Sequence, residues 1–286
     1  MTLREAQQET LLLLKKHYDS RESANICDWV MEHITGQTRI DRLINKEISL
    51  TEAQKTQLQK IQTEIDLHKP IQYILGEAWF GGYRFLVSED TLIPRPETEE
   101  LVEWICSDYR EEAEKPQDFL DVGTGSGCIP VLLKKKLPAA NLSGLDISEK
   151  ALAIARKNAG QLDVRIQWMA TDFLNETTWD RLPTYDLIVS NPPYIKRSEE
   201  KNLASHVLDF EPGLALFVPD DDALLFYRKL ADFATTHLTN HGHIYVEINE
   251  SLGMETLQLF TEKKFQAVLK QDMQGKDRMI KAWKKR

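Results

Sequence analysis

Apolar residues follow different patterns in the two parts of the chain. Up to residue 76 they recur every three or four positions, which predicts short amphipathic helices. Examples at this spacing are Ala24, Cys27, Val30, Met31 and Ile34. From residue 118 onward, short apolar runs alternate with stretches at helical spacing. The first pattern is typical of a small helical bundle, and the second predicts an α/β domain with a doubly wound sheet.

The helices of the first part carry their own start and stop signals. Thr2-Leu3-Arg4-Glu5 and Thr51-Glu52-Ala53-Gln54 are capping-box sequences. Pro70 is suited to open a last short helix, and Gly76 is placed to close it. The apolar periodicity itself indicates no chemistry. We therefore expect residues 1–76 to form a separate N-terminal helical domain.

Residues 77–92 have a different character, because aromatic residues flank a Gly-Gly pair. This pattern predicts a β-hairpin, which we interpret as a linker to a second domain, residues 93–286. That domain opens with a stiff extended segment in which Arg95 lies between two prolines, and a helix begins near Glu97. Glu97 can serve simply as an acidic residue of a first helical turn. We expect the rigidly held Arg95 guanidinium to meet a carboxylate.

Seven apolar runs in the second domain predict strands. A short turn with Gly275 separates the last two runs, so the final strand should be antiparallel to its predecessor. In sheets of this class, ligands bind at the carboxyl ends of the parallel strands. The polar residues that follow the first four strands are therefore candidate site residues. The seven runs are 119–122, 142–146, 165–169, 185–190, 243–248, 265–270 and 278–283.

The first strand ends in a glycine-rich turn, Asp121-Val122-Gly123-Thr124-Gly125-Ser126-Gly127, and a helix follows. Glycines allow a tight turn and let a ligand approach the backbone closely. The second strand ends at Asp146, whose carboxylate is suited to accept hydrogen bonds from a ribose. Asp146 could instead cap the next helix, although Ser148 is equally able to do so. Together these features describe a nucleoside-containing cofactor that lies across the first two strands.

The identity of this cofactor depends on the spacing of the glycines. The turn reads G-x-G-x-G, with Cys128 where a dinucleotide fingerprint requires Gly or Ala, and no residue set for hydride transfer is visible. This favours S-adenosylmethionine over NAD. The third strand is followed by Asp172 and Phe173. Asp172 could accept from an adenine amino group and Phe173 could pack on its ring; alternatively, they are a turn residue and a core aromatic residue.

The fourth strand leads directly into Asn191-Pro192-Pro193-Tyr194. The prolines make this corner rigid before any ligand arrives. The Asn191 side-chain oxygen and the Pro192 carbonyl are suited to accept both N–H donors of a planar NH₂ group, on which Tyr194 can stack. Asn-Pro turns are also common where strands end, but the position after a buried strand favours the functional interpretation. The following span, 195–222, is expected to be a long polar loop that contacts substrate.

Composition narrows the possible partners. The net charge of −9 argues against broad binding of duplex DNA through its phosphates, and we expect no direct nucleic-acid binding. No apolar run is long enough to span a bilayer, and the N-terminus lacks a signal-peptide core, so we expect a cytoplasmic protein without membrane contact. The three cysteines and seven histidines show no metal-ligand spacing, so we expect no metal.

Over most of its length, the sequence resembles the HemK-type protein-(glutamine-N5) methyltransferases, the PrmC family, which modify peptide chain release factors. The Asn-Pro-Pro-Tyr sequence alone is shared with methyltransferases that act on amino groups of DNA and RNA. The Pro-Arg-Pro-Glu-Thr-Glu stretch and the helical N-terminal part are the features that favour the release-factor methyltransferases over those that act on DNA and RNA. The stretches that carry it begin at Pro70, Leu92, Asp121, Ser190 and Asp272.

The resemblance implies a seven-stranded, Rossmann-like class I methyltransferase domain. It also implies S-adenosylmethionine as methyl donor, S-adenosylhomocysteine as product and the glutamine of a release-factor Gly-Gly-Gln motif as acceptor. The residues Asn191, Pro192, Pro193 and Tyr194 would hold the glutamine amide, with Asp121, Arg95 and Glu97 in supporting positions. The residues implied to contact the cofactor are Gly123, Thr124, Gly125, Ser126, Gly127, Asp146, Phe173 and Asn191.

Other functions stay open at this point. The same chemistry could act on a glutamine of a ribosomal protein or on an adenine amino group, although an adenine substrate would favour a basic cleft. A protein of a different class, a noncatalytic scaffold that binds the cofactor and recruits release factors, would need neither an intact Asn191 nor an unbroken glycine turn. Because residues 1–76 are separate from the expected cofactor site, our hypothesis is that they recognise the protein substrate.

Overall fold

The computed structural model describes residues 1–112, 114–203 and 205–285. The chain forms two compact units, Met1–Gly76 with Ser205–Phe210, and Glu77–Ala204 with Glu211–Arg286. In the described part of the chain, no helix is both long and apolar enough to cross a membrane. The helices of the first unit are α1 (Leu3–Leu14), α2 (Ser20–Thr35), α3 (Arg39–Ile44), α4 (Glu52–Asp66), α5 (Ile71–Leu75) and α9 (Ser205–Phe210).

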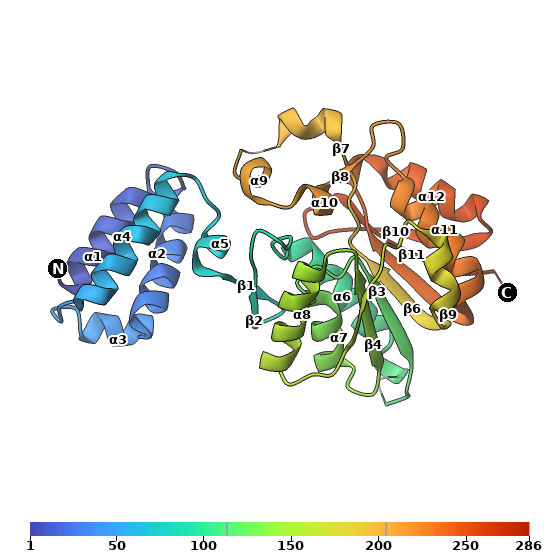
Figure 1. The fold of residues 1–286 in the computed structure, drawn as a ribbon, viewed down its shortest axis with the longest axis horizontal. Helices are drawn as coiled ribbons and strands as arrows, with labels where there is room; N and C mark the ends of the chain where they lie inside the picture. The colour runs from blue at the N-terminus through green and yellow to red at the C-terminus, as the bar shows by residue number, and fades with distance from the viewer. Residues whose placement is uncertain (113, 204, 286) are drawn as a thin grey trace. The chain divides into compact units, whose positions relative to one another are not determined.

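Helices α1, α2 and α4 pack side by side around an apolar core in the first unit (Figure 1). Both predicted capping boxes are present, with the side chains of Thr2 and Thr51 accepting from the third helical N–H. Pro70 precedes α5 and Gly76 ends it, as predicted. Of the five residues at helical spacing in α2, Ala24 is exposed, and the other four, Cys27, Val30, Met31 and Ile34, are buried.

The second unit contains the remaining elements. Its helices are α6 (Pro96–Asp108), α7 (Cys128–Lys136), α8 (Glu149–Gln161), α10 (Gly213–Leu216), α11 (Leu225–His237) and α12 (Gly253–Glu262). Its strands are β1 (Glu77–Phe80), β2 (Tyr83–Leu86), β3 (Asp118–Val122), β4 (Asn141–Asp146), β5 (Gln167–Ala170), β6 (Tyr185–Ser190), β7 (Ile195–Lys196), β8 (Phe217–Val218), β9 (Leu238–Glu247), β10 (Phe265–Gln271) and β11 (Asp277–Lys284). Its short 3₁₀ helices are η1 (Arg110–Glu112), η2 (Glu176–Arg181), η3 (Arg197–Asn202) and η4 (Glu250–Leu252).

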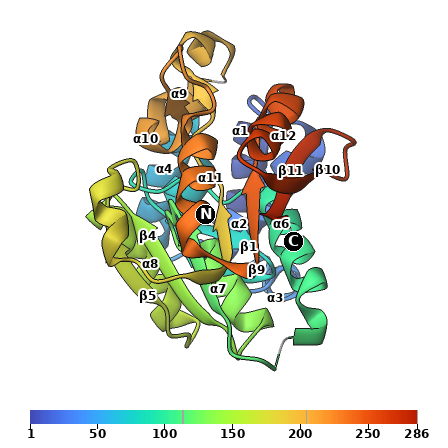
Figure 2. The ribbon, with the colours of Figure 1, turned by 90° about the vertical axis from the view of Figure 1, so that its right-hand side faces the viewer.

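Seven strands form one sheet in the order β10-β11-β9-β6-β3-β4-β5, with β5 and β10 at opposite ends (Figure 2). The pairs from β9 to β5 are parallel, and β11 is antiparallel to both of its neighbours, as predicted. The chain proceeds outward from β3 through β4 to β5 and then returns to β6 on the other side of β3. Because the strand order reverses there, the carboxyl ends of β3 and β6 border a crevice suited to a ligand.

Helices cover both faces of this sheet (Figure 1). Neighbouring residues of a strand point to opposite faces, so Phe119 packs with α6 and α7 whereas Leu120 packs with α11. Helix α8 lies on the same face as α7. The expected doubly wound α/β architecture is confirmed.

The predicted hairpin forms, but it packs into the core of the second unit. Phe80 and Phe85 are fully buried there. The Asn158 side chain accepts from the Leu86 N–H (2.7 Å) and donates to the Leu86 carbonyl (3.0 Å). A Cβ at Gly81 would lie 2.3 Å from Leu132, so only glycine permits this close approach. The hairpin is therefore a structural part of that unit.

The span expected to be a long polar loop contains several short elements. Strands β7 and β8 form a parallel pair within the second unit. Helix α9 belongs to the first unit, where the Lys69 ammonium lies 6.0 Å from the centre of the Phe210 ring. The expectation of one continuous loop is therefore wrong, because apolar residues such as Leu216 and Val218 are buried within this span.

Candidate functional site

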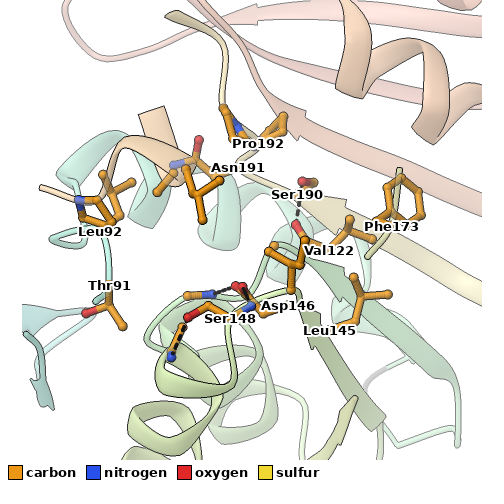
Figure 3. Close-up of a pocket in the computed structure, with 18 of the residues that line it drawn as sticks. Thr91, Leu92, Val122, Leu145, Asp146, Ser148, Phe173, Ser190, Asn191 and Pro192 are labelled. Carbon is orange, nitrogen blue, oxygen red and sulfur yellow. Dashed lines mark hydrogen bonds between the residues drawn. The ribbon is translucent and has the colours of Figure 1, made fainter. Parts of the chain in front are cut away.

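A cavity of about 420 Å³ opens at the carboxyl ends of β3, β4 and β6. Asn191 and Pro192 lie on one side of it, and Asp146 and Ser148 lie on the opposite side (Figure 3). We call residues 121–127 the glycine turn and residues 191–194 the proline corner. Both segments contribute to the lining, so two of the stretches that the sequence singled out meet at one cavity.

Two glycines of the glycine turn line the cavity, and a third has a packing role. Gly123 (φ +75°) and Gly125 (φ +52°) adopt a left-handed backbone that brings their main chain to the cavity. Gly127 (φ +78°) packs elsewhere, since a Cβ there would lie 2.9 Å from the Trp168 ring. The side chains of Thr124 and Ser126 are buried, and neither residue is part of the cavity lining.

The Asp146 carboxylate connects the glycine turn to the segment that precedes α8. It accepts from the Gly125 N–H (2.8 Å) and from the Ser148 N–H (2.9 Å), as Figure 3 shows. Burial raises the pKa of Asp146, although these hydrogen bonds oppose the change. The Ser148 hydroxyl caps α8 by accepting from the Ala151 N–H. Asp146 is thus free of the capping role that the sequence had left open, and it lines the cavity.

Asp121, at the start of the glycine turn, is completely buried. Its Oδ2 accepts a hydrogen bond from the Thr124 hydroxyl (2.6 Å), whereas its Oδ1 has no partner among the described residues. Burial raises the pKa of Asp121 to about 7; the Thr124 bond opposes the rise and the charge of Asp146 adds to it. Asp121 therefore lies behind the cavity wall, where it can be neutral near physiological pH.

Asp172 and Phe173 both border the cavity. Asp172 is exposed, and its Oδ1 accepts from the Leu174 N–H (3.0 Å). The Phe173 ring is buried, with its centre 5.5 Å from that of Trp179 and 5.4 Å from that of Phe233. Phe173 is therefore a core aromatic residue that also presents part of its surface to the cavity.

Three residues of the proline corner, Asn191, Pro192 and Pro193, line the cavity. The Asn191 Nδ2 group donates to the Thr98 hydroxyl (3.0 Å). Tyr194 is outside the lining; its ring packs against the sheet core, and its hydroxyl lies 3.4 Å from Oε1 of Glu247. Burial raises the pKa of Tyr194. In this structure Tyr194 therefore connects the proline corner to the sheet core and to Glu247.

The two supporting residues of the Pro-Arg-Pro-Glu stretch lie beside this site. Arg95 forms an ion pair with the buried carboxylate of Glu211, so the expected meeting with a carboxylate is confirmed. Glu97 lies in the first turn of α6, and its charge contributes to raising the pKa of Glu247.

Sequence reasoning missed Thr98 and Glu247 as site residues. Glu247 ends β9, the strand next to β6, so the rule that pointed to Asn191 could also have identified Glu247. Thr98 lies in the Pro-Arg-Pro-Glu-Thr-Glu stretch that the sequence singled out, but its contact with Asn191 is long-range and no local pattern indicates it. Among the residues that the structure describes, no three His, Cys, Asp or Glu side chains gather as a metal site would require.

Two family descriptions match this chain. Residues 5–76 match the PrmC N-terminal domain, and residues 105–210 match the methyltransferase small domain. Two solved structures are similar to this chain in fold. A methyltransferase from Pyrococcus furiosus has a TM-score of 0.51 at 15% identity, covering 78% of this chain and 97% of that one. A 16S rRNA methyltransferase of T. thermophilus in complex with AdoMet and guanosine has a TM-score of 0.52 at 17% identity. The match covers 73% of this chain and 50% of that one.

Similar proteins match this chain over nearly its whole length. A release factor glutamine methyltransferase of Flavobacterium psychrophilum is 44% identical over 266 residues, which cover 92% of this chain and 93% of the relative. A protein of the same name from Bacteroides thetaiotaomicron is 41% identical, and the match covers 86% of this chain and 87% of that relative. The chain therefore belongs to the PrmC family of release factor glutamine methyltransferases.

Proposed function

We propose that this protein methylates the side-chain amide nitrogen of the Gly-Gly-Gln glutamine in peptide chain release factors, with S-adenosylmethionine as methyl donor. The relatives named as release factor glutamine methyltransferases support this substrate. The observation that carries the proposal is the cavity itself, because residues of both the glycine turn and the proline corner line it. The proposal keeps the expectation of a cytoplasmic protein, because release factors act in translation.

The residues of the glycine-turn side fit the cofactor. Because Gly123 and Gly125 have no side chain, nothing of these two residues lies between their main chain and the cavity. The Asp146 carboxylate, at the end of β4, suits ribose hydroxyls, and Phe173 with Asp172 suits adenine. When bound, S-adenosylmethionine supplies a sulfonium methyl group that needs no further activation.

The proline-corner side fits a planar amide. Because Asn191 Nδ2 donates to Thr98, the side-chain oxygen of Asn191 remains as an acceptor. This oxygen and the Pro192 carbonyl would take the two N–H donors of the glutamine amide. The protein would thus contribute orientation, which fixes the nitrogen against the donor side of the cavity. The rigid prolines maintain this geometry before substrate binds.

The experiment that tests the proposal is a methyl-transfer assay with labelled S-adenosylmethionine. It compares a purified release factor, its Gln→Ala version at the Gly-Gly-Gln motif, and DNA. Label on the first substrate alone is the expected result. Label on the Gln→Ala protein would move the acceptor to another residue, and label on DNA would move the activity to the adenine alternative. Cofactor binding without any transfer would favour the scaffold alternative.

We also propose that the first unit contributes to recognition of the release factor. This unit has its own apolar core and matches a domain found in the family. A truncated protein that lacks residues 1–76 should have a raised KM for whole release factor and a nearly unchanged KM for a short Gly-Gly-Gln peptide. Circular dichroism would verify that the second unit is folded. Equal effects on both substrates would contradict this role.

A further inference from the structure

A chain of buried hydrogen bonds connects the proline corner to two residues outside the cavity. The Asn191 Nδ2 group donates to Thr98 Oγ1 (3.0 Å), and the Thr98 hydroxyl donates to Glu247 Oε2 (2.6 Å). Thr98 is 3% exposed and Glu247 is 1% exposed. The three residues come from the end of β6, the first turn of α6 and the end of β9. Thr98 and Glu247 are not among the residues that line the cavity, and the hydrogen-bond chain connects them to Asn191, which does line it.

The direction of these bonds follows from the number of protons. A carboxylate can only accept, and a threonine hydroxyl has a single proton to donate. Once that proton is given to Glu247, Thr98 can only accept from Asn191. The side chain of Asn191 must then present its NH₂ group to Thr98, and its oxygen is left for another partner. The ionised carboxylate thus determines which end of a nearly symmetric amide is available to substrate.

We propose that Thr98 and Glu247 are positioning residues that fix the Asn191 amide with its oxygen toward the substrate NH₂ group. This inference rests on the proposed function, in which Asn191 accepts from a glutamine amide. Protonation of Glu247 would reverse the chain: the carboxylic acid would donate to Thr98, and Thr98 would donate to the Asn191 oxygen. Two NH₂ groups would then face each other, and the substrate amide would lose an acceptor.

The surroundings of Glu247 make this protonation relevant near neutral pH. Burial raises the pKa of Glu247 to about 7, whereas the Thr98 bond and the charge of Arg278 oppose the rise. Arg278 is itself bonded to Asp272 (3.1 Å) and Glu250 (3.1 Å). The titratable and charged groups that face Glu247 are Glu97 of α6, Tyr194 of the proline corner, Tyr227 of α11 and Arg278 of β11.

The test uses isosteric variants of the full chain. Thr98→Val removes the hydroxyl but keeps the shape, and Thr98→Ser retains the hydroxyl. Glu247→Gln keeps the shape but removes the ionisation. Tyr227→Phe is a matched control, because the Tyr227 hydroxyl donates to the main-chain carbonyl of Glu247 (3.1 Å) and takes no part in the chain to Asn191. The measurements are kcat and KM on release factor between pH 6 and 9, and the Kd for S-adenosylhomocysteine.

We expect Thr98→Val to lower kcat by about tenfold to a hundredfold, with the Kd for S-adenosylhomocysteine changed by less than about twofold. Thr98→Ser should restore most of the loss. Wild-type activity should fall below about pH 7, and Glu247→Gln should abolish this acidic limb. Tyr227→Phe should lower the midpoint of thermal unfolding but preserve the pH profile. Wild-type kcat and an unchanged acidic limb in both Thr98→Val and Glu247→Gln would overturn the inference.

A second measurement separates this inference from the proposed function. In protein labelled with ¹⁵N at asparagine, the side-chain NH₂ signals of Asn191 are identified by their loss in Asn191→Ala. They should shift as Glu247 titrates near pH 7, and Glu247→Gln should abolish the shift. A protein that shows this titration but transfers no methyl group to release factor would support the hydrogen-bond chain and contradict the function. Active protein without the titration would contradict the chain alone.

Discussion

The glycine turn and the proline corner both line one cavity, but the bonds that hold them differ in range. The glycine turn combines a local bond, from Thr124 to Asp121 three residues away, with a bond to the end of the neighbouring strand, where Gly125 donates to Asp146 21 residues away. In the proline corner, Asn191 is bonded to Thr98 across 93 residues of sequence. The turn is thus held partly by its own residues and partly by the adjacent strand β4, whereas the corner acquires its hydrogen-bond direction only after α6 and β9 have packed.

The largest effect that distinguishes the two sides is expected from Asn191→Ala. The variant removes the side-chain acceptor on the substrate side and leaves Asp146 and the glycine turn untouched. We expect kcat to fall about a thousandfold, as for the loss of a group that orients the reacting atoms. The Kd for S-adenosylhomocysteine, measured by calorimetry, should stay within about threefold. Full turnover in this variant would refute the assignment of Asn191 to the substrate amide.

A second prediction concerns Asp121, a buried carboxyl of the glycine turn with a hydrogen-bond partner at only one of its two oxygens among the described residues. It is tested by the pH dependence of protein stability. The pKa of Asp121 is raised in the folded protein, from 3.8 to about 7. Its favourable contribution to folding is therefore complete below about pH 4 and is lost as the pH rises through 7. Asp121→Asn cannot ionise and should escape this loss, so the variant should gain up to about 4 kcal/mol on the wild type between pH 4 and 8.

The measurement for Asp121 is the free energy of unfolding from denaturant titrations at each pH. The absolute stability of Asp121→Asn does not test the prediction, because a buried amide changes the local hydrogen bonding equally at every pH. The ionisation of Asp121 is isolated by the way in which the difference in free energy of unfolding between Asp121→Asn and the wild type changes with pH. A constant difference between pH 4 and 8 would show that the Asp121 carboxyl titrates well below neutrality in the folded protein.

Asp146→Ala should produce the opposite pattern from Asn191→Ala. It removes the carboxylate that accepts from Gly125 and Ser148 and that faces the cavity. Because hydrogen bonds to a charged acceptor contribute about 1.5–3 kcal/mol, the Kd for S-adenosylhomocysteine should rise about a hundredfold. At saturating cofactor, kcat should remain within about fivefold. A lowered kcat with unchanged cofactor affinity would place Asp146 on the substrate side instead.

The same contrast explains how much of the fold the sequence could predict. The capping boxes at Thr2 and Thr51 depend on residues three positions apart, and they were recognised correctly. The seven strands of the main sheet were also found, because apolar runs are local signals. The hairpin was recognised as a hairpin and misinterpreted as a linker. Its packing depends on Asn158, which lies 72 residues from Leu86, and no local pattern indicates that contact.

In the candidate site, too, the features that depend on local sequence could be predicted and those that depend on long-range packing could not. The glycine turn and the Asn191 corner were identified because each follows a buried strand. Within the glycine turn, however, the sequence could not separate Gly125, which borders the cavity, from Gly127, which packs against Trp168. Nor could it show that Tyr194 is directed toward Glu247, since that depends on the alignment of β6 with β9. The sequence could predict which residue types lie at the site, but the direction of each side chain depends on tertiary packing.

The smallest expected effect concerns the bond that connects the two sides. Ser190, the last residue of β6, donates from its hydroxyl to the Val122 carbonyl at the end of β3 (2.7 Å; Figure 3). Ser190→Ala removes one buried hydrogen bond and should lower the free energy of unfolding by about 1 kcal/mol. Because backbone pairing still aligns the two strands, kcat and the cofactor Kd should each change by less than about threefold. A loss of turnover comparable to that of Asn191→Ala would mean that this single side chain, rather than the strand alignment, sets the spacing between the glycine turn and the proline corner.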